Sequence, residues 1–291
     1  MKISEISGFI PLLKERGRSS NQEIQLLKRR LDLRKVGHCG TLDPIADGVL
    51  PVLVNRATRT MRFFLEYPKT YLATIKLGIS TDSLDITGRV ISESVPVVDR
   101  MEFIDVIKRY RQEIVQKIPE FSASKFKGKS LYHYARKGIK VPEKVRRVVI
   151  YEIEMKRFEP PYIEIEVICS SGTYIRQLIN DICKELRVDG TMYALTRSSY
   201  GRFNLNNSKR LNELTEEDII PVDKVFLEYG RFFIKSSIFS GACNGAPISV
   251  DDCREILDID AKRFIGFADE KMIGIYRKEG ETFFAEVILI E

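Results

Sequence analysis

The chain has 291 residues, 44% of them hydrophobic and 30% charged, which is typical of a soluble globular protein large enough for more than one domain. It has no run of 18 apolar residues and no signal-peptide cleavage site, so a membrane protein is excluded and a cytoplasmic location is expected. The net charge is +6, and five scattered cysteines with only two histidines predict reduced thiols and no metal site. Without a GxxxxGK[ST] or GxGxxG loop, no cofactor is predicted.

The first predicted elements are a helix, a loop and a strand. The segment Ser20–Glu23 has the spacing of a capping box, and apolar residues follow at helical intervals, which predicts a helix over about 21–32. A loop dense in Gly, Pro and Asp follows at 34–51. Alternation of apolar and polar residues predicts a half-buried strand at 70–78.

Further along the chain, apolar spacing predicts a helix over Asp99–Ile118, a strand at 162–169 and a helix that opens at Gly172–Thr173. Strands mixed with helices without regular βαβ alternation favour an α+β fold with a largely antiparallel mixed sheet and flanking helices. After about residue 228, short strand-like runs separated by Gly and Asn indicate a small all-β module. We therefore expect one domain over 1–225 and a second over 228–291.

The segment 125–147 is strongly basic. It holds nine lysines and arginines against one glutamate, a larger excess than that of the whole chain, and Phe126, Tyr132, His133 and Tyr134 lie among the cations. Cations neutralise phosphates and flat rings stack on exposed bases. The combination favours an RNA-binding segment over a solvated charged loop, without indicating which RNA.

The loop GHCGTLDP is the candidate for chemistry. Gly37 and Gly40 would permit a tight backbone that brings His38 and Asp43 close to a ligand. Most aspartates in Asp-Pro sequences only hold a turn, so the loop by itself leaves both interpretations of Asp43 open.

Six segments, in order along the chain, together resemble the TruB family of tRNA pseudouridine synthases over about residues 8–215. The segments are KERGRSSN (14–21), KVGHCGTLDPIADGVLPV (35–52), KTYLATIKLGISTDSLDITG (69–88), IPEFSASKFKGKSLYHYARKG (118–138), SSGTYIRQLINDI (170–182) and ALTRSSYGRF (194–203). The tail resembles a PUA-type RNA-binding barrel.

The resemblance implies a pseudouridine-synthase catalytic domain over 1–225, with an RNA-clasping insertion at about 119–147, and a PUA-like β-barrel over 228–291. It implies conversion of uridine to pseudouridine at position 55, in the T-loop of elongator tRNAs, after the base has been flipped out. The expected partner is the T-stem-loop of tRNA, with no cofactor and no obligatory protein partner, and the protein is expected to be a monomer. Assistance in tRNA folding is compatible with this activity.

The resemblance also implies roles for individual residues. Asp43 would be the catalytic carboxylate, Arg176 its two-pronged partner, and Tyr71 the ring that stacks on the flipped uracil. His38 would help to extrude the base, Tyr174 would line the pocket and Leu195 would close it. On the insertion, the residues expected to contact RNA are Lys125, Lys127, Lys129, Tyr132 and Arg136. Whether the carboxylate adds to the base or acts at the sugar stays open.

Three positions depart from the family pattern. Glu15 stands where proline is usual, Cys39 where threonine is usual, and Asp47 replaces a small hydroxyl residue. Asp47 adds a second carboxylate to the catalytic loop, but the motif gives the catalytic role to Asp43.

Two other functions fit part of this pattern. One is a non-catalytic RNA chaperone, which the presence of both Asp43 and Arg176 disfavours. The other is the guide-RNA-dependent relative that works inside a protein complex, which the length of the basic insertion disfavours. Activity on bare tRNA would separate the second from a stand-alone enzyme.

Overall fold

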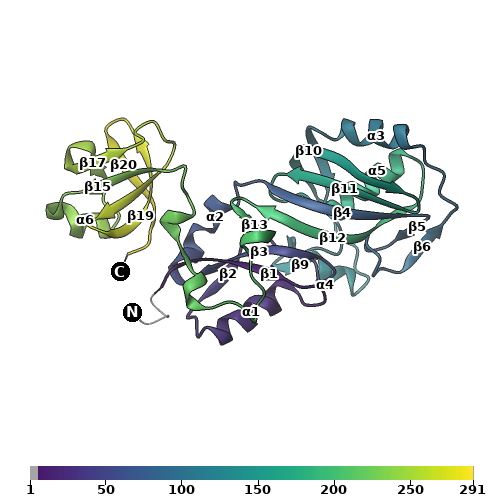
Figure 1. Cartoon of the computed structure of the whole chain (residues 1–291), viewed down its shortest axis with the longest axis horizontal. Helices are drawn as coiled ribbons and strands as arrows, with labels where there is room; N and C mark the ends of the chain where they lie inside the picture. Colours follow the sequence, from purple (N-terminus) through teal and green to yellow (C-terminus); the bar gives the residue numbers. More distant parts are fainter. Residues whose placement is uncertain (1–5, 291) are drawn as a thin grey trace.

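The computed structural model describes residues 6–290, which form an elongated molecule built on two curved sheets (Figure 1). The larger sheet extends through the middle of the molecule, and the smaller one, formed by the C-terminal residues, lies at one end. No helix in the described range is long and apolar enough to cross a membrane.

The larger sheet has ten strands. They are β1 (Gly8–Lys14), β2 (Val36–His38), β3 (Asp47–Val54), β4 (Lys69–Leu77), β7 (Glu113–Lys117), β10 (Val145–Glu159), β11 (Tyr162–Cys169), β12 (Gly190–Tyr200), β13 (Phe203–Asn204) and β14 (Ile220–Pro221). The order is β14-β1-β3-β12-β4-β11-β10-β7, with β2 beside β3 and β13 beside β12. Only β3 and β12 pair in parallel. The predicted α+β fold with a largely antiparallel mixed sheet is confirmed.

Short hairpins and helices flank this sheet. The helices are α1 (Ser20–Arg30), α2 (Met61–Phe64), α3 (Arg100–Arg109), α4 (Leu131–Ala135) and α5 (Ile175–Glu185), and the hairpins are β5 (Ile79–Thr81) with β6 (Val90–Glu93) and β8 (Lys125–Phe126) with β9 (Lys129–Ser130). Helices α3 and α5 pack against β10 and β12 and against each other, and together cover one end of the sheet (Figure 1). Apolar side chains between these layers form the main core.

Two details of the predicted helices are wrong. The helix expected over Asp99–Ile118 ends at Arg109, and its second half is β7, because residues 113–117 pair with β10 and this long-range pairing outweighs local helical spacing. The capping box at the start of α1 is made by Ser19 with Gln22, one residue earlier than expected. Ser20 is already inside the helix and its hydroxyl has a different partner.

The smaller sheet confirms the predicted C-terminal β-module. Its strands are β15 (Gly230–Ile234), β16 (Ile248–Ser249), β17 (Cys253–Leu257), β18 (Phe264–Ala268), β19 (Lys271–Glu279) and β20 (Thr282–Ile288), and α6 (Phe239–Cys243) packs beside them. The order is β16-β20-β19-β18-β15-β17, with β16 and β17 at the edges, and the sheet curls as a half-barrel (Figure 1).

A shared hydrophobic cluster joins the two sheets. Phe9 and Phe63 from the region of the larger sheet pack in one cluster with Ile265 and Leu289 from the smaller. Arginines of the 3₁₀ helix at Asn55–Thr60 and of α2 add hydrogen bonds to backbone carbonyls of the C-terminal strand region: Arg56 to Leu289, Arg59 to Ile288 and Arg62 to Glu286. The C-terminal sheet is therefore packed against the segment that follows β3.

Gly48 is required for the parallel pairing of β3 with β12. Its φ is +104°, and a Cβ atom there would lie 2.3 Å from the carbonyl oxygen of Arg197 on β12. Gly17 has a similar φ of +102°, but no atom lies within 4 Å of its Cβ position. The two glycines therefore share a backbone requirement and differ in available space.

We predict that Gly17→Ala lowers the free energy of unfolding by roughly 1–3 kcal/mol, the usual strain for such a backbone conformation. Gly48→Ala should cost about 1–3 kcal/mol more, because β3 and β12 must also move apart. Urea denaturation of both variants measures the difference. Equal losses would show that the β3–β12 contact tolerates a methyl group.

Candidate active site

A cavity of about 290 Å³ lies between the loop before β3, the strands β4 and β12, and the N-terminus of α5. Five of the six residues expected to act on the base line it: Asp43, Tyr71, Tyr174, Arg176 and Leu195. These residues come from four separate parts of the sequence. His38, the sixth, is not part of the lining.

Asp43 and Arg176 form the two-pronged ion pair that the motifs imply. Nε of Arg176 donates to Oδ2 of Asp43 at 2.9 Å, and Nη2 donates to Oδ1 at 3.3 Å. The Arg176 side chain is 4% exposed, whereas that of Asp43 is 34% exposed. Both carboxylate oxygens are therefore oriented by the guanidinium group, while part of the carboxylate stays accessible from the cavity.

The remaining donors of Arg176 bind the backbone of two other segments. Nη1 donates to the carbonyl oxygen of Ser83 at 2.7 Å, and Nη2 donates to that of Phe121 at 2.8 Å. The buried carboxylate of Asp85 lies 3.8 Å from Nε and supplies a second negative charge. Since a guanidinium group is a rigid fork of donors, these contacts fix the plane in which Arg176 meets Asp43.

Asp85 is a site residue that the sequence reasoning missed. Its Oδ1 accepts hydrogen bonds from the hydroxyl of Ser83 at 2.9 Å and from the backbone N–H of Thr87 at 3.0 Å. The residue lies in the motif 69–88, but its distance from Arg176 in the sequence hides their contact. Only the fold brings them together.

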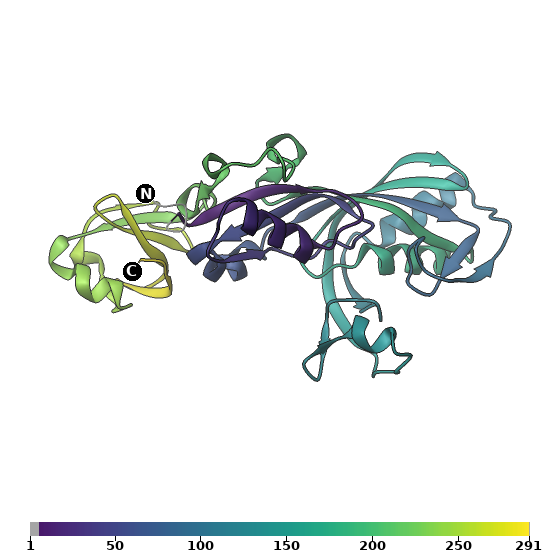
Figure 2. The same ribbon diagram turned by 90° about the horizontal axis from the view of Figure 1, so that it is seen from below.

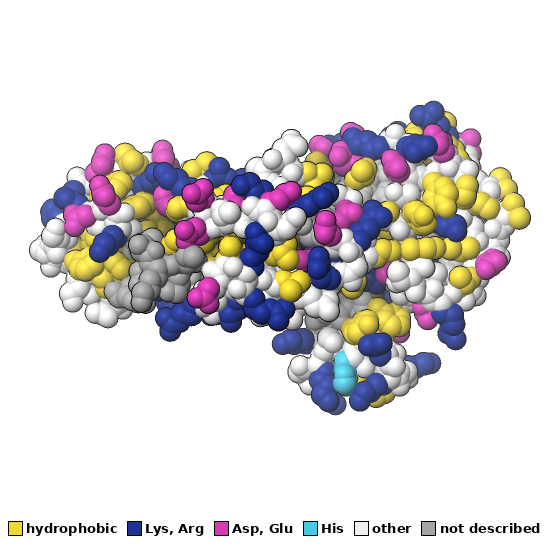
Figure 3. Space-filling view, turned by 60° about the horizontal axis from the view of Figure 1, so that its bottom comes forward, with side chains coloured by type: hydrophobic (Ala, Val, Ile, Leu, Met, Phe, Trp, Pro, Cys, Tyr) yellow, Lys and Arg dark blue, Asp and Glu magenta, His cyan; other side chains and the backbone are white. Residues whose placement is uncertain are grey.

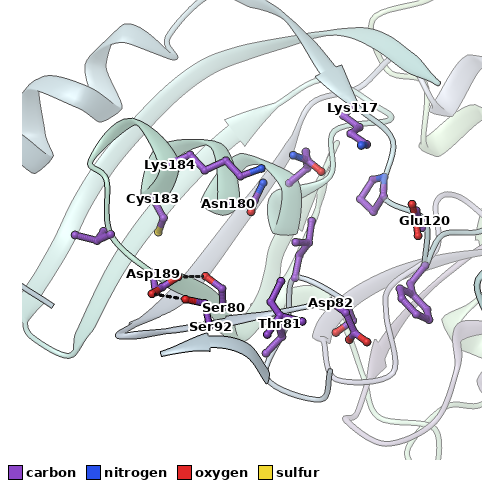
Figure 4. Close-up of a pocket in the computed structure, with 18 residues that line it drawn as sticks. Ser80, Thr81, Asp82, Ser92, Lys117, Glu120, Asn180, Cys183, Lys184 and Asp189 are labelled. Carbon is purple, nitrogen blue, oxygen red and sulfur yellow. Dashed lines mark hydrogen bonds between the residues drawn. The ribbon is translucent and has the colours of Figure 1, made fainter. Parts of the chain in front are cut away.

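A second cavity, of about 430 Å³, lies behind the segments of Ser83 and Phe121, both of which line it. Within it, Ser80 of β5 and Ser92 of β6 donate to the carboxylate of Asp189 at 2.7 and 2.9 Å (Figure 4). These bonds hold the β5–β6 hairpin against the start of β12. They thereby support the turn that presents the Ser83 carbonyl to Arg176.

The loop that carries Asp43 is held by two buried polar side chains. The hydroxyl of Ser20 donates to the carbonyl of Leu42 at 2.9 Å and accepts from its N–H at 2.8 Å. The ammonium group of Lys14 donates to the carbonyl of Ala46 at 2.7 Å, and burial lowers the pKa of Lys14 to about 8. The loop is therefore anchored on both sides of Asp43.

Tyr71 lies on the buried face of β4, and Arg197 of β12 lies beside it. Nη1 of Arg197 donates to the Tyr71 hydroxyl at 3.5 Å, and Nε donates to the Val49 carbonyl at 2.7 Å. Burial raises the pKa of Tyr71, although Arg197 opposes that shift, so the phenol is neutral at pH 7. Arg197 is fully buried and is a second residue that the sequence reasoning missed.

Tyr174 and Leu195 both line the cavity. Tyr174 is the N-cap residue of α5, and its backbone N–H and carbonyl both bind the amide of Gln116 on β7, at 2.8 and 3.1 Å. Leu195 lies on β12, opposite Ala73 of β4. Both backbones are therefore held by the sheet rather than by loops.

His38 ends β2, outside the cavity lining. Its Nδ1 is buried without a hydrogen-bond partner among the described residues. Burial, and secondarily Arg197, lower the pKa of His38, so the imidazole is neutral at pH 7. A role for His38 in base extrusion stays a prediction.

The three departures from the family pattern leave the cavity intact. Asp47 is bound by Arg16 at 2.7 Å and by the hydroxyl of Thr196 at 2.5 Å, and it does not line the cavity. Cys39 is buried, which raises the pKa of its thiol to about 12 and leaves it unreactive at neutral pH. Glu15 lies at the surface.

The basic segment forms an arm that stands away from the body between β7 and β10 (Figure 2). At its hairpin, Lys127 and Gly128 both have positive φ, as in a tight two-residue β-turn. Lys125, Lys127 and Lys129 are exposed, and none of them has an ion pair with a carboxylate in residues 6–290. Lysine and arginine side chains gather on this arm (Figure 3).

Aromatic residues of the arm pack on one another. Tyr132 is 46% exposed, meets the ring of Phe121 edge-on at 6.1 Å, and lies 5.5 Å from the guanidinium carbon of Arg136. Phe126 and Tyr134 form a similar pair at 5.8 Å. Because the carbonyl of Phe121 also binds Arg176, the base of the arm is connected to the cavity.

Comparison with known proteins identifies the family. Residues 28–175, half of the chain, match the family described as "TruB family pseudouridylate synthase (N terminal domain)". The chain belongs to the TruB family. It is 35% identical to tRNA pseudouridine synthase B of Caldicellulosiruptor saccharolyticus and 36% identical to that of Clostridium tetani, over 96% of this chain and 96% and 98% of theirs. A member of the TruB family with this coverage is a pseudouridine synthase, as expected from the motifs.

Solved structures agree with this family assignment at the level of the fold. "Crystal Structure of a Cbf5-Nop10-Gar1 Complex" contains a chain that is 24% identical, with a TM-score of 0.75 over 100% of this chain and 86% of that one. "Structure of H/ACA RNP bound to a substrate RNA containing 2'-deoxyuridine" has a TM-score of 0.75 at 22% identity. Because the match covers the whole of this chain, it includes both the larger sheet and the C-terminal sheet.

The Ser20 anchor can be tested against its neighbour Ser19. We expect Ser20→Ala to lower the free energy of unfolding by about 1–3 kcal/mol, because the buried carbonyl and N–H of Leu42 lose their hydrogen-bond partner. We also expect it to slow turnover by displacing the loop. Ser19→Ala removes only the helix cap, at a cost of about 1 kcal/mol, and should keep its turnover. Urea denaturation and single-turnover rates measure both effects. Full activity in Ser20→Ala would show that the loop holds its shape without this anchor.

Proposed function

We propose that the protein converts uridine 55 in the T-loop of tRNA into pseudouridine, with Asp43 as the catalytic carboxylate. The observation that carries this proposal is a partly accessible Asp43, oriented by two hydrogen bonds from the buried Arg176, at the wall of a cavity. The substrate class follows from relatives of nearly equal length that are named tRNA pseudouridine synthase B.

The arrangement suits the reaction. The C1′–N1 bond must break, the uracil must turn, and C1′ must join C5, with no net oxidation and no atom added. A fixed carboxylate can bond covalently to the base or the sugar, or stabilise positive charge at C1′. Arg176 orients Asp43, and it does so while a third of the carboxylate side chain stays exposed.

The cavity also suits a single flipped base. It is at the lower end of the size range of ligand sites, and Leu195, the residue expected to close it, is part of its lining. Tyr71 and Tyr174 supply two aromatic rings to its lining. Extracting a uridine from its stack costs a few kcal/mol, which contacts elsewhere on the tRNA must offset.

The arm and the C-terminal sheet are the proposed sources of those contacts. In this proposal the catalytic domain comprises 1–225 with the arm as its RNA clasp, and 228–291 is a PUA-like RNA-binding domain. The relatives at 35–36% identity favour tRNA over a guide-RNA complex as the working partner. The protein would then act as a monomer in the cytoplasm on bare tRNA, which incubation of the purified protein with unmodified tRNA and mapping of pseudouridine tests directly.

The catalytic assignment predicts a contrast between two aspartates. Asp43→Asn should reduce turnover by at least about 10⁴-fold with little change in tRNA affinity, because an amide can neither act as a nucleophile nor stabilise a cation as a carboxylate does. Asp47→Asn is the matched control, since Asp47 lies on the same loop but outside the cavity lining. Single-turnover rates and filter binding measure both. An active Asp43→Asn with an inactive Asp47→Asn would reverse the assignment.

The arm predicts a change in the salt dependence of binding. Changing Lys125, Lys127 and Lys129 together to glutamine should weaken tRNA binding and lower the slope of log K against log salt by roughly two to three units, because each cation on a phosphate releases a counterion. Turnover at saturating tRNA should persist. Binding across a salt series measures the slope.

The control for this experiment uses cations that already have carboxylate partners. Lys108, Arg109 and Arg111 lie 3.5, 2.6 and 3.5 Å from carboxylate oxygens of Asp105, Glu185 and Glu152, respectively. Changing these three to glutamine alters the net charge equally but should leave the slope almost unchanged. Equal slopes in the two triple variants would indicate that the arm lysines touch no phosphate.

A further inference from the structure

A buried lysine points at the same cavity as Asp43. Lys69 lies on β4 two residues before Tyr71, so both side chains are on one face of the strand, and both line the cavity. Lys69 is only 6% exposed. Its ammonium group reaches the space left free by Gly40, where a Cβ atom would lie 3.1 Å from Nζ.

This ammonium group has no counter-ion. Among residues 6–290 it makes neither an ion pair nor a hydrogen bond. It makes a cation–π contact with the ring of Tyr200, with Nζ 4.6 Å from the ring centroid. Buried lysines are normally compensated by a carboxylate or by carbonyl groups. Lys14, equally buried, shows the usual arrangement with its carbonyl acceptors. Lys69 therefore has donors left for a ligand.

The surroundings of Lys69 increase its positive field. Arg197 of β12 and Arg146 of β10 are the cations that act on it, whereas Cys39 and Cys169 are neutral because burial raises the pKa of their thiols to about 12 and 11. Burial, followed by Arg197, lowers the pKa of Lys69 to about 8. The charge of Asp43 is already matched by Arg176. Even when the carboxylate of Asp85 is counted, the cations Arg176, Lys69, Arg146 and Arg197 leave this region with surplus positive charge.

The reaction creates a negative charge that this surplus fits. When C1′–N1 breaks, the electron pair stays on N1, so the uracil becomes an anion with charge on O2 and O4, while C1′ becomes cationic or bonds to the Asp43 carboxylate. After rotation, C5 supplies the electron pair of the new C5–C1′ bond; C5 then loses its proton and N1 gains one. If Asp43 instead adds first to C6 of the base, the resulting enolate also has its charge on O4.

We propose that Lys69 is a catalytic residue that donates a hydrogen bond from its ammonium group to a carbonyl oxygen of the uracil and stabilises the base when it becomes anionic. The proposal rests on the proposed function, since it needs the uridine in the cavity beside Asp43. It holds for both routes, because each of them places negative charge on the base. Asp43 and Lys69 then stabilise opposite charges of the same transition state.

Two simpler roles for Lys69 fit the structure less well. A phosphate stays with the RNA backbone, and the exposed Arg146, which also lines the cavity and has no carboxylate partner within residues 6–290, is better placed to bind it than a lysine that is almost completely buried. A purely structural contact with Tyr200 would need no charge, and an apolar side chain of equal length would fill the same space at a lower cost of burial.

The test compares Lys69→Met, which keeps length without charge, with Lys69→Arg, which keeps charge. The control is Lys76→Met, on the same strand but outside the cavity. With saturating unmodified tRNA, Lys69→Met should slow the single-turnover rate roughly 100-fold or more with little change in Kd. Lys69→Arg should recover part of the rate, and Lys76→Met should match the wild type.

A pH series provides a readout that a structural role would not change. In the wild type, kcat/KM should fall above about pH 8, as the Lys69 ammonium group loses its proton. This descending limb of the pH profile should move to higher pH in Lys69→Arg. Lys14, whose pKa is also about 8, would produce a limb that stays in place. The arginine variant keeps the test valid if Lys69→Met does not fold.

Three results would overturn the proposal: a folded Lys69→Met with a normal rate, a limb that does not move in Lys69→Arg, or a loss confined to Kd and its salt slope, which would indicate a phosphate contact. Failure of the proposed function is a separate outcome. It would appear as an active Asp43→Asn, or as wild-type product at a position other than 55.

Discussion

The guanidinium group of Arg176 is the constraint on which the rest of the site depends. It is almost completely buried, and such a charge is stable only when its donors have acceptors in the right places. Those acceptors come from the Asp43 loop, the turn at Ser83 and the base of the arm at Phe121. Three segments far apart in the sequence must therefore place their acceptors around the plane of one guanidinium group. The sheet, the β5–β6 hairpin and the hydrogen bonds of Ser20 and Lys14 hold these segments in place.

Charge in this region is distributed unevenly. Around Arg176 the carboxylates of Asp43 and Asp85 outnumber the cation, while Lys69 in the cavity lining and the buried Arg197 beside Tyr71 have no carboxylate partner among the described residues. A cavity lined by groups of both charges suits a substrate that separates charge as it reacts. The low exposure of Arg176 and Lys69 strengthens their fields, because water screens buried charges less.

Much of this could be predicted from the sequence. Alternation located β4 and β11 because both strands have one buried face, and the ordered motifs identified Asp43, Tyr71, Tyr174, Arg176 and Leu195, which do share a cavity. The helix expected beyond Arg109 failed because β7 is stabilised by a strand thirty residues away. Asp85, Lys69 and Arg197 were missed for the same reason. A charged side chain in a motif shows neither its burial nor its partner until the strands are paired.

The bond between Phe121 and Arg176 has a consequence for how substrate and enzyme influence each other. The Phe121 carbonyl belongs to the arm, so a conformation in which the arm is lifted leaves the guanidinium group short of one acceptor. By thermodynamic linkage, RNA that favours the seated arm also favours the ordered ion pair, and an ordered ion pair favours RNA binding by the same factor. RNA binding at the arm and ordering of the ion pair inside the cavity are thus coupled through one equilibrium.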